Sequence, residues 1–248
     1  MSVDYVSDNL SVPNLDRLFP NMIVGSKEAI TWPYFRKEID HTWYVDRRDP
    51  QVGFINKDEA AILFSNARLF AGRRGLEIGA WRGWSTCHLL VSELASLHVI
   101  EPLLADADWN REFVGAIEGT GEAHRAILVP GPSPDEVVRL GETGCRWSFV
   151  FIDGDHDGQA PTIDALACER YLEPTAMILF HDLVSPHVSA ALRALNARGG
   201  WSTRIYQTAQ MIGVAWRGDI APVRHRPDPN QKWRIPDHLT GFAVSNCL

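Results

Sequence analysis

Short apolar segments recur along the middle of the chain and alternate with segments in which apolar residues repeat at helical spacing. The apolar segments predict strands at residues 75–79, 97–101, 125–129, 148–153, 176–181, 203–206 and 211–216. Most of them are separated by enough chain for a crossover helix, which predicts parallel pairing. The last two are too close together for a helix, so we expect an antiparallel hairpin. The chain is therefore predicted to be an α/β protein built on a mostly parallel, seven-stranded sheet.

Helices are expected between these strands, on both faces of the sheet. The polar residues at 56–59 open one helix, and its apolar stripe consists of Leu63, Ala67 and Phe70. A helix between the fourth and fifth strands is expected to bury Ile163, Leu166, Ala167 and Tyr171. Another begins with Ser185 as its cap and Pro186 as its first residue, and ends at Gly199.

The segments before and after these elements differ in composition from the middle of the chain. Residues 1–56 carry many aromatic side chains among prolines and charges, and we interpret them as a cap or lid. Their aromatic rings either pack on the main core or line a substrate pocket, and the sequence leaves both open. Residues 57–218 form the predicted α/β domain. Residues 219–248 are rich in prolines and charges and are expected to wrap around that domain as a C-terminal extension.

Charge and cysteine usage exclude several classes of function. The chain has 248 residues, with 31 acidic side chains against 24 lysines and arginines, and no basic block that would favour nucleic acid as a partner. Its cysteines, Cys87, Cys145, Cys168 and Cys247, form no C-x-x-C pair, which argues against a zinc cluster or a redox dithiol. No segment approaches the roughly 20 apolar residues of a spanning helix, and the first residues do not form a signal peptide. We therefore expect a cytoplasmic protein with no membrane partner.

The most informative motif is the heptapeptide at residues 77–83, Glu-Ile-Gly-Ala-Trp-Arg-Gly, followed by the strand that ends in Glu101. Strand, glycine turn, helix and second strand form a Rossmann-like unit that binds a nucleoside-bearing cofactor. Gly79 and Gly83 allow a tight turn and a close approach of ligand. The helix that includes Ser85 would point its positive end at the ligand. The carboxylate of Glu101 would accept hydrogen bonds from the ribose hydroxyls.

The spacing of the glycines distinguishes between cofactors. A dinucleotide fold normally shows G-x-G-x-x-G, because pyrophosphate sits on the helix terminus. This chain has E-x-G-x-x-x-G, which suits a cofactor without phosphate. An NAD(P)-dependent oxidoreductase is therefore the second hypothesis. A tight turn in some other α/β protein is the simplest structural alternative.

Two neighbouring apolar strands end in ionisable side chains. One is followed by Asp153, Asp155 and His156, and the next by His181 and Asp182. Because ligands of open α/β sheets bind at the carboxyl ends of strands, we expect a reacting centre there. The alternative is a pair of capping aspartates with hydrogen-bonded structural histidines.

These motifs together resemble the class I S-adenosylmethionine (SAM)-dependent methyltransferases. The I-D-G-D-H string, the later H-D pair and the G-P-S tripeptide at 131–133 are similar to the subfamily of macrocin O-methyltransferase and other antibiotic-tailoring sugar O-methyltransferases, and more distantly to catechol O-methyltransferase. The resemblance covers about residues 55–217. It implies a Rossmann-like sheet and transfer of a methyl group from SAM to a hydroxyl.

The resemblance also assigns roles to individual residues. Glu77 would lie near the methionine end of SAM and Glu101 on its ribose, with the backbone at Gly131 and Ser133 near the adenine. Asp153, close to the cofactor, and Asp182 would hold a magnesium ion, with Asp155 as the base that removes the acceptor's proton.

This sequence departs from the family pattern at His181, where several members have an oxygen ligand. Magnesium prefers oxygen ligands, so an imidazole here argues for manganese or for no metal. It leaves His181 as another candidate base. His156 is a third candidate, or else a residue that orients the aspartates.

The sequence therefore predicts an O-methyltransferase acting on a small hydroxylated molecule, with a sugar or a glycosylated natural product as the class that the resemblance suggests. A non-catalytic SAM-binding module is a third hypothesis. We also expect a homo-oligomer, as is usual for such enzymes.

Overall fold

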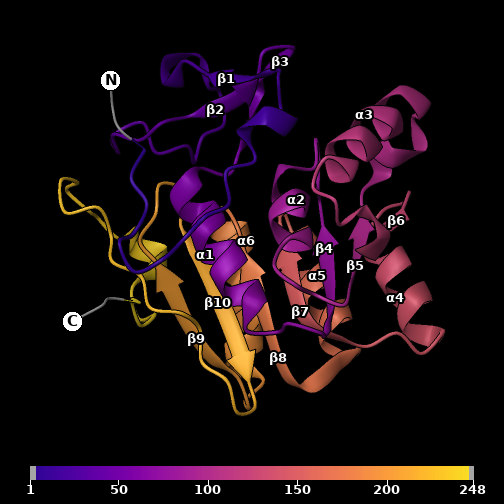
Figure 1. Ribbon diagram of the computed structural model, residues 1–248. Helices are drawn as coiled ribbons and strands as arrows, with labels where there is room; N and C mark the ends of the chain where they lie inside the picture. The colour runs from indigo at the N-terminus through magenta and orange to yellow at the C-terminus, as the bar shows by residue number, and fades with distance from the viewer. Residues whose placement is uncertain (1–3, 246–248) are drawn as a thin grey trace.

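Seven strands form the central sheet of the computed structural model, which describes residues 4–245 (Figure 1). Their order across the sheet is β6-β5-β4-β7-β8-β10-β9. Their bounds are β4 Arg74–Ile78, β5 Ser96–Ile100, β6 Ala126–Val129, β7 Trp147–Ile152, β8 Leu172–Phe180, β9 Ser202–Tyr206 and β10 Ile212–Arg217. Strands β4 to β8 pair in parallel, whereas β10 pairs antiparallel with both β8 and β9. The predicted fold class and the C-terminal hairpin are confirmed.

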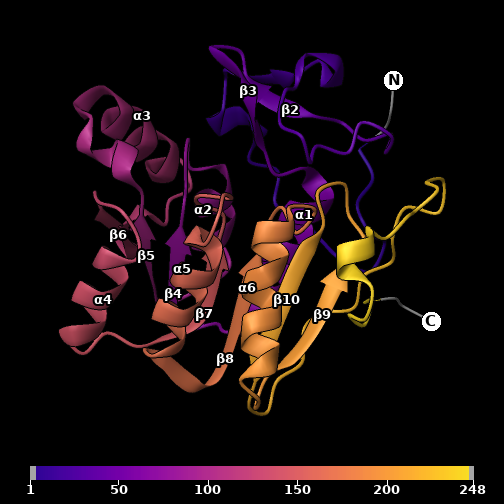
Figure 2. The same ribbon diagram turned by 180° about the vertical axis from the view of Figure 1, so that it is seen from behind.

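Three helices cover each face of this sheet (Figures 1 and 2). One layer contains α1 Lys57–Arg68, α2 Trp84–Leu90 and α3 Ala107–Glu118; the other contains α4 Asp135–Glu142, α5 Ala160–Glu169 and α6 Pro186–Ala197. The buried strand β7 packs against both helix layers. Phe149 and Phe151 lie in one apolar core, and Val150 and Ile152 lie in the other. A strand covered on both faces has to be apolar throughout, and this explains its unbroken hydrophobic sequence.

The predicted apolar face of α5 is wrong in part. Ile163 is 44% exposed, and Tyr171 lies beyond the helix end. The side of α5 that faces the sheet instead buries Ala165 and Cys168 among other residues. Small side chains let this helix approach the sheet closely, and a count of large apolar residues at helical spacing does not detect them.

The N-terminal segment contains a sheet that the sequence pattern did not predict. Its strands are β1 Met22–Val24, β2 Tyr44–Asp46 and β3 Asp49–Phe54, paired antiparallel in that order. This small sheet lies over the carboxyl ends of the parallel strands (Figure 1). Short 3-10 helices complete the fold at Asp16–Leu18, Lys27–Ala29, Pro102–Ala105, Ala123–Arg125 and Asp237–Leu239.

The N-terminal and C-terminal segments meet over the start of α1. Asp58 accepts a hydrogen bond from the Ser7 backbone N–H at 3.0 Å, and its other oxygen lies 2.8 Å from His225 Nε2. The Arg226 N–H in turn donates to the Ser7 hydroxyl at 2.9 Å. The two segments therefore hold each other in place, although more than 200 residues separate them.

Two further features concern membranes and cysteines. Within residues 4–245, no helix has the length and apolar character needed to span a bilayer. Cys87, Cys145 and Cys168 are free thiols, and Cys247 lies outside the described residues.

Candidate active site

A cavity of about 580 Å³ opens at the carboxyl ends of β4, β5, β7 and β8. The glycine turn after β4 and the end of β5 form one wall. The ends of β7 and β8 form a second wall, and residues of the N-terminal cap form a third. The position of this cavity agrees with the rule that ligands of open α/β sheets bind beyond the carboxyl ends of strands.

The glycine turn depends on Gly79. This residue has a φ of +79°, and a Cβ atom built on it would lie 2.3 Å from the backbone oxygen of Asp153. Only glycine therefore lets the end of β4 pack against the end of β7. Gly83, at a φ of +87°, precedes α2 and faces the ring of Phe113, so it shapes the turn without lining the cavity.

Glu101 follows β5 and holds the same turn from the other side. Its Oε2 accepts hydrogen bonds from the backbone N–H groups of Ala80 and Trp81, both at 2.9 Å. Its Oε1 accepts one from Leu103 at 3.0 Å. Because each carboxylate oxygen has two lone pairs, Glu101 can stabilise the turn and still accept from a ligand hydroxyl. The predicted ribose contact remains a prediction, and Glu101 lines the cavity as that contact requires.

Glu77 is placed differently from the expectation. It is fully buried behind Ser85, a residue that lines the cavity, and it is not itself one of the lining residues. Thr86 donates a hydrogen bond of 2.5 Å to its Oε2, whereas Oε1 has no partner among the described residues. Burial raises the pKa of Glu77 to about 8, so the carboxyl is largely protonated at neutral pH. Through Thr86 it ties α2 to β4, and a direct contact with the methionine end of a cofactor does not fit this position.

The G-P-S tripeptide contributes Pro132 and, next to it, Ser133 to the wall of the cavity. The Ser133 hydroxyl donates to Asp164 Oδ2 at 3.0 Å. Asp164, a residue of α5 that carries no motif, is 2% exposed, and burial raises its pKa to about 6. Gly131 lies outside the cavity lining, against the side chain of Glu136.

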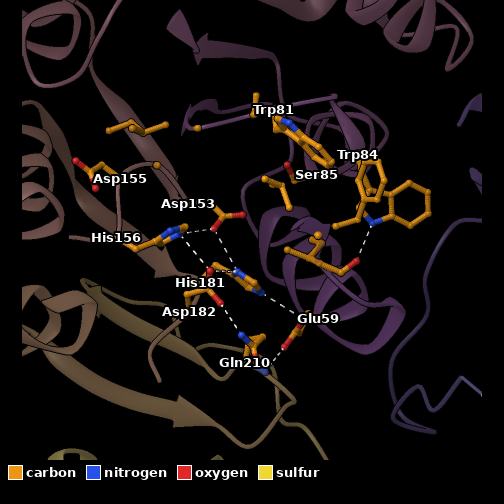
Figure 3. A pocket seen from close by; sticks show the side chains of 18 of the residues that line it. Glu59, Trp81, Trp84, Ser85, Asp153, Asp155, His156, His181, Asp182 and Gln210 are labelled. Atoms are coloured by element: carbon orange, nitrogen blue, oxygen red, sulfur yellow. Dashed lines mark hydrogen bonds and ion pairs between the residues drawn. The ribbon is translucent and has the colours of Figure 1, made fainter. Parts of the chain in front are cut away.

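The strand ends bring two aspartates and two histidines together (Figure 3). Asp153 Oδ1 lies 3.3 Å from His156 Nε2 and 3.2 Å from His181 Nδ1. Asp182 Oδ2 lies 3.2 Å and 3.4 Å from the same two nitrogens. Each imidazole therefore touches both carboxylates. The expectation that these side chains meet is confirmed.

Glu59 and Gln210 complete this cluster and were not predicted. Glu59 Oε2 lies 3.3 Å from His181 Nε2, and its Oε1 accepts from the backbone N–H of Gln210 at 2.9 Å. The Gln210 side chain donates to Asp182 Oδ1 at 3.3 Å. Glu59 also closes a capping box with Asn56 at the start of α1. In the sequence, Glu59 was therefore recognisable only as part of a helix start. That pattern gave no indication of its contact with His181.

The electrostatics of the cluster follow from these contacts. Burial alone would raise the pKa of Asp153, but His181 and His156 outweigh it and hold this pKa at about 2. Burial would lower the pKa of His156, but Asp182 and Asp153 raise it to about 9. The same two carboxylates, with Glu59, raise the pKa of His181 well above its ordinary value. Both imidazoles are therefore protonated at neutral pH in this arrangement.

Two candidate bases lose support from this geometry. Asp155 is exposed, points away from the cluster in Figure 3 and accepts a hydrogen bond from the Asp157 N–H at 2.9 Å. His181 is buried and has carboxylates against both ring nitrogens, so it offers no free nitrogen to an acceptor. His156 is the more accessible imidazole, with 30% of its side chain exposed against 8% for His181.

The residues do not fit a magnesium site. Asp153, His181 and Asp182 can each place one donor atom within 4.8 Å of the others. One of the three donors is nitrogen, however, whereas magnesium takes oxygen ligands in near-octahedral geometry. Both carboxylates are also engaged by imidazoles, whose positive charge compensates theirs.

Comparisons with known proteins agree with this architecture. Residues 76–183 match the sequence family described as a methyltransferase domain. None of the curated proteins compared with the chain matches it. An O-methyltransferase from Bacillus cereus, solved with S-adenosylhomocysteine (SAH), is 16% identical, with a TM-score of 0.59 over 66% of this chain and 83% of its own. The O-methyltransferase TomG from Streptomyces achromogenes, involved in tomaymycin synthesis and solved with SAM, is 20% identical, with a TM-score of 0.57 over 66% and 82%.

A third structure covers more of the molecule. It is a Klebsiella pneumoniae protein whose description gives O-methyltransferase as a proposed activity; it is 20% identical, with a TM-score of 0.62 over 85% of this chain and 92% of its own. At such identities the likeness shows the fold. The chain shares its α/β fold with these solved structures.

Proposed function

We propose that this protein is a SAM-dependent O-methyltransferase whose acceptor is a small hydroxylated molecule. The observation that carries the proposal is the single cavity in which the glycine turn with Glu101 faces the cluster of Asp153, His156 and Asp182. The match to the methyltransferase family and the similar structures solved with SAM or SAH support SAM as the cofactor. The sugar class suggested by the sequence motifs remains part of this proposal.

Bound SAM would supply an electrophilic methyl group on its sulfonium. The protein has to bring an acceptor oxygen into line with the sulfur–methyl bond and remove its proton. His156 is the imidazole that lines the cavity and is accessible to an acceptor. In its neutral form it takes the hydroxyl proton, and Asp153 and Asp182 orient the ring and stabilise the imidazolium that forms. No divalent metal is needed for these steps.

The cap contributes aromatic side chains and a hydrogen bond to the same centre. The ring of Trp32 lies 5.9 Å from that of His156, and Trp81 lies beside Phe54 at 4.8 Å. The backbone N–H of Arg36 donates to Gln210 at 3.3 Å, which ties the cap to the cluster. Trp32, Phe35 and Trp43 line the cavity, whereas Tyr34 and Tyr44 lie outside its lining and pack against the apolar cores.

The test is calorimetric titration of the purified protein with SAH, followed by a methyl-transfer assay with labelled SAM. We expect micromolar binding of SAH that a chelator does not change, and weaker binding by Glu101→Ala. A protein that binds NADH and not SAH would instead be the oxidoreductase of the second hypothesis. SAH binding with no methyl transfer to any acceptor of a broad hydroxylated panel would favour the non-catalytic module. Homo-oligomeric assembly and a cytoplasmic location remain predictions.

A further inference from the structure

Asp164 is a buried carboxylate that the proposed mechanism does not use. It lies on α5 and is 2% exposed, whereas Ala165 and Cys168, buried on the same helix, have small side chains that carry no charge. Burying a carboxylate costs free energy unless the group is hydrogen-bonded. Among residues 4–245, the hydrogen bond found for its side chain is donated by the Ser133 hydroxyl to Oδ2, at 3.0 Å. The role of Asp164 therefore has to be sought at Ser133.

This contact fixes the direction of the Ser133 hydroxyl. Burial raises the pKa of Asp164 to about 6, so the carboxyl is ionised at pH 8 and can only accept hydrogen bonds. The single hydrogen of the Ser133 hydroxyl is then directed at Asp164. Ser133 lines the cavity and is partly exposed, and its oxygen has only lone pairs left for a ligand. A ligand group that bonds to this oxygen must therefore be a donor.

The position of Ser133 along the sheet indicates which part of SAM lies beside it. β6 is the edge strand next to β5, so the loop after β6 lies beside Glu101 at the end of β5 (Figure 1). The Glu101 N–H donates to the Val129 carbonyl at 3.2 Å, which holds the two strand ends together. The cluster around Asp153 lies on the other side of Glu101, beyond β4. With its methyl group at that cluster and its ribose on Glu101, SAM has to extend its adenine toward Ser133.

Adenine and the 6-oxo purines differ at the group that such an acceptor contacts. The amino group at C6 of adenine donates hydrogen bonds, whereas the oxygen at C6 of guanine or hypoxanthine only accepts them. Two acceptors that face each other form no hydrogen bond. A site built for a hydrogen bond rejects an analogue that cannot form it.

We propose that Asp164 is a positioning residue that selects adenine over 6-oxo purines, by holding the Ser133 hydroxyl so that its oxygen accepts from the adenine amino group. This inference rests on the proposed function for the identity of the cofactor. Asp164 lies outside the cavity lining, so it acts through Ser133 and does not contact the cofactor itself.

The test compares SAH with S-inosylhomocysteine, in which an oxygen replaces the C6 amino group and N1 gains a hydrogen. Each is titrated calorimetrically into the purified protein at pH 8. We expect SAH to bind at least about tenfold more tightly than the inosine analogue. Equal binding of the two probes, or tighter binding of the inosine analogue, overturns the proposal.

Asp164→Ala locates the effect, because it frees the Ser133 hydroxyl to donate to the C6 oxygen. The ratio of the two affinities is expected to fall below about threefold, chiefly through tighter binding of the inosine analogue. A general loosening of α5 would weaken both probes and leave their ratio unchanged. The matched control is Asp135→Ala, an exposed aspartate at the start of α4, which should keep the ratio of the unmodified protein. An Asp164→Ala ratio that stays at about tenfold overturns the proposal.

Ser133→Ala keeps the test decisive if Asp164→Ala does not fold. It removes the accepting oxygen, so SAH should bind several-fold more weakly while the inosine analogue binds as before or more tightly. An unchanged ratio in this variant overturns the contact between Ser133 and the adenine amino group, and the selection by Asp164 with it.

The outcomes distinguish this proposal from the proposed function. Binding of SAH without selectivity overturns the role of Asp164 and leaves the SAM site intact. Failure of both probes to bind overturns the proposed function, and the selection of adenine with it.

Discussion

The wall of the cavity that is expected to bind the cofactor and the wall that is expected to bind the acceptor are built in different ways. The first comes mainly from residues 78–102, with Ser133 beside them, and uses backbone geometry, Gly79 and one carboxylate. The second gathers Glu59, Asp153 to His156, His181, Asp182 and Gln210, together with the cap. Local chain geometry thus specifies one wall, and packing between distant segments specifies the other.

This difference predicts that changes on the two walls have separable effects. The largest is expected for His156→Ala, which removes the proposed base. Turnover should fall by roughly 10²–10⁴-fold, the usual contribution of a general base, while the affinity for SAH changes less than twofold. Steady-state assays and calorimetry measure the two quantities. Asp155→Asn is the control, and a loss as large there would return the base to Asp155.

The pH dependence of turnover tests the assignment of His156 as the base in a second way. Asp182 and Asp153 raise the pKa of His156 to about 9, so only its neutral fraction can accept a proton. That fraction grows about tenfold per pH unit well below the pKa, and turnover should therefore rise roughly 50-fold from pH 7 to pH 9 and level off above that pH. A profile already flat from pH 6 upward would contradict the neutral imidazole as base.

Gly79→Ala tests the cofactor wall. A Cβ atom there has to enter the space of the Asp153 backbone while the residue keeps a φ of +79°. The turn should shift, and the affinity for SAH is expected to fall by about tenfold or more. Gly72→Ala is the matched control, since Gly72 has a φ of +73° with open space around it. Equal losses in the two variants would show that backbone strain alone, and not contact with β7, is responsible.

Glu77→Gln should give the smallest effect, seen as a pH-dependent gain in stability. The folded chain holds the proton of Glu77 up to a pH of about 8, against an ordinary pKa of 4.5. Folding therefore takes up a proton between these values, and the free energy of unfolding falls as pH rises through that window. Glutamine cannot ionise and keeps an oxygen for Thr86. Its melting temperature should exceed that of the unmodified protein by a few degrees at pH 8 and by less at pH 5. The same difference at both pH values would contradict the raised pKa.

Much of the fold could be predicted because its signals are local. Most strands of the central sheet contain an apolar run of their own. The predicted bounds agree with the structure to within one residue, except that β8 begins at Leu172 and not at residue 176. The cap sheet was missed because β1 and β2 have three residues each, too few for an alternating pattern. The face of α5 was misjudged because its inward side is built from small residues.

The sequence by itself determined the order of strands and helices, the position of the glycine turn and the arrival of Asp153, His156, His181 and Asp182 at one edge of the sheet. Each of these depends on residues that are close together in the chain, or on the rule that parallel strands share a carboxyl edge. The tertiary structure alone decided the protonation of the cluster and the contents of the acceptor wall. The burial of the cluster and the positions of Glu59, Gln210, His41 and Trp43 in the cavity wall arise only when distant segments pack. No spacing along the chain encodes them.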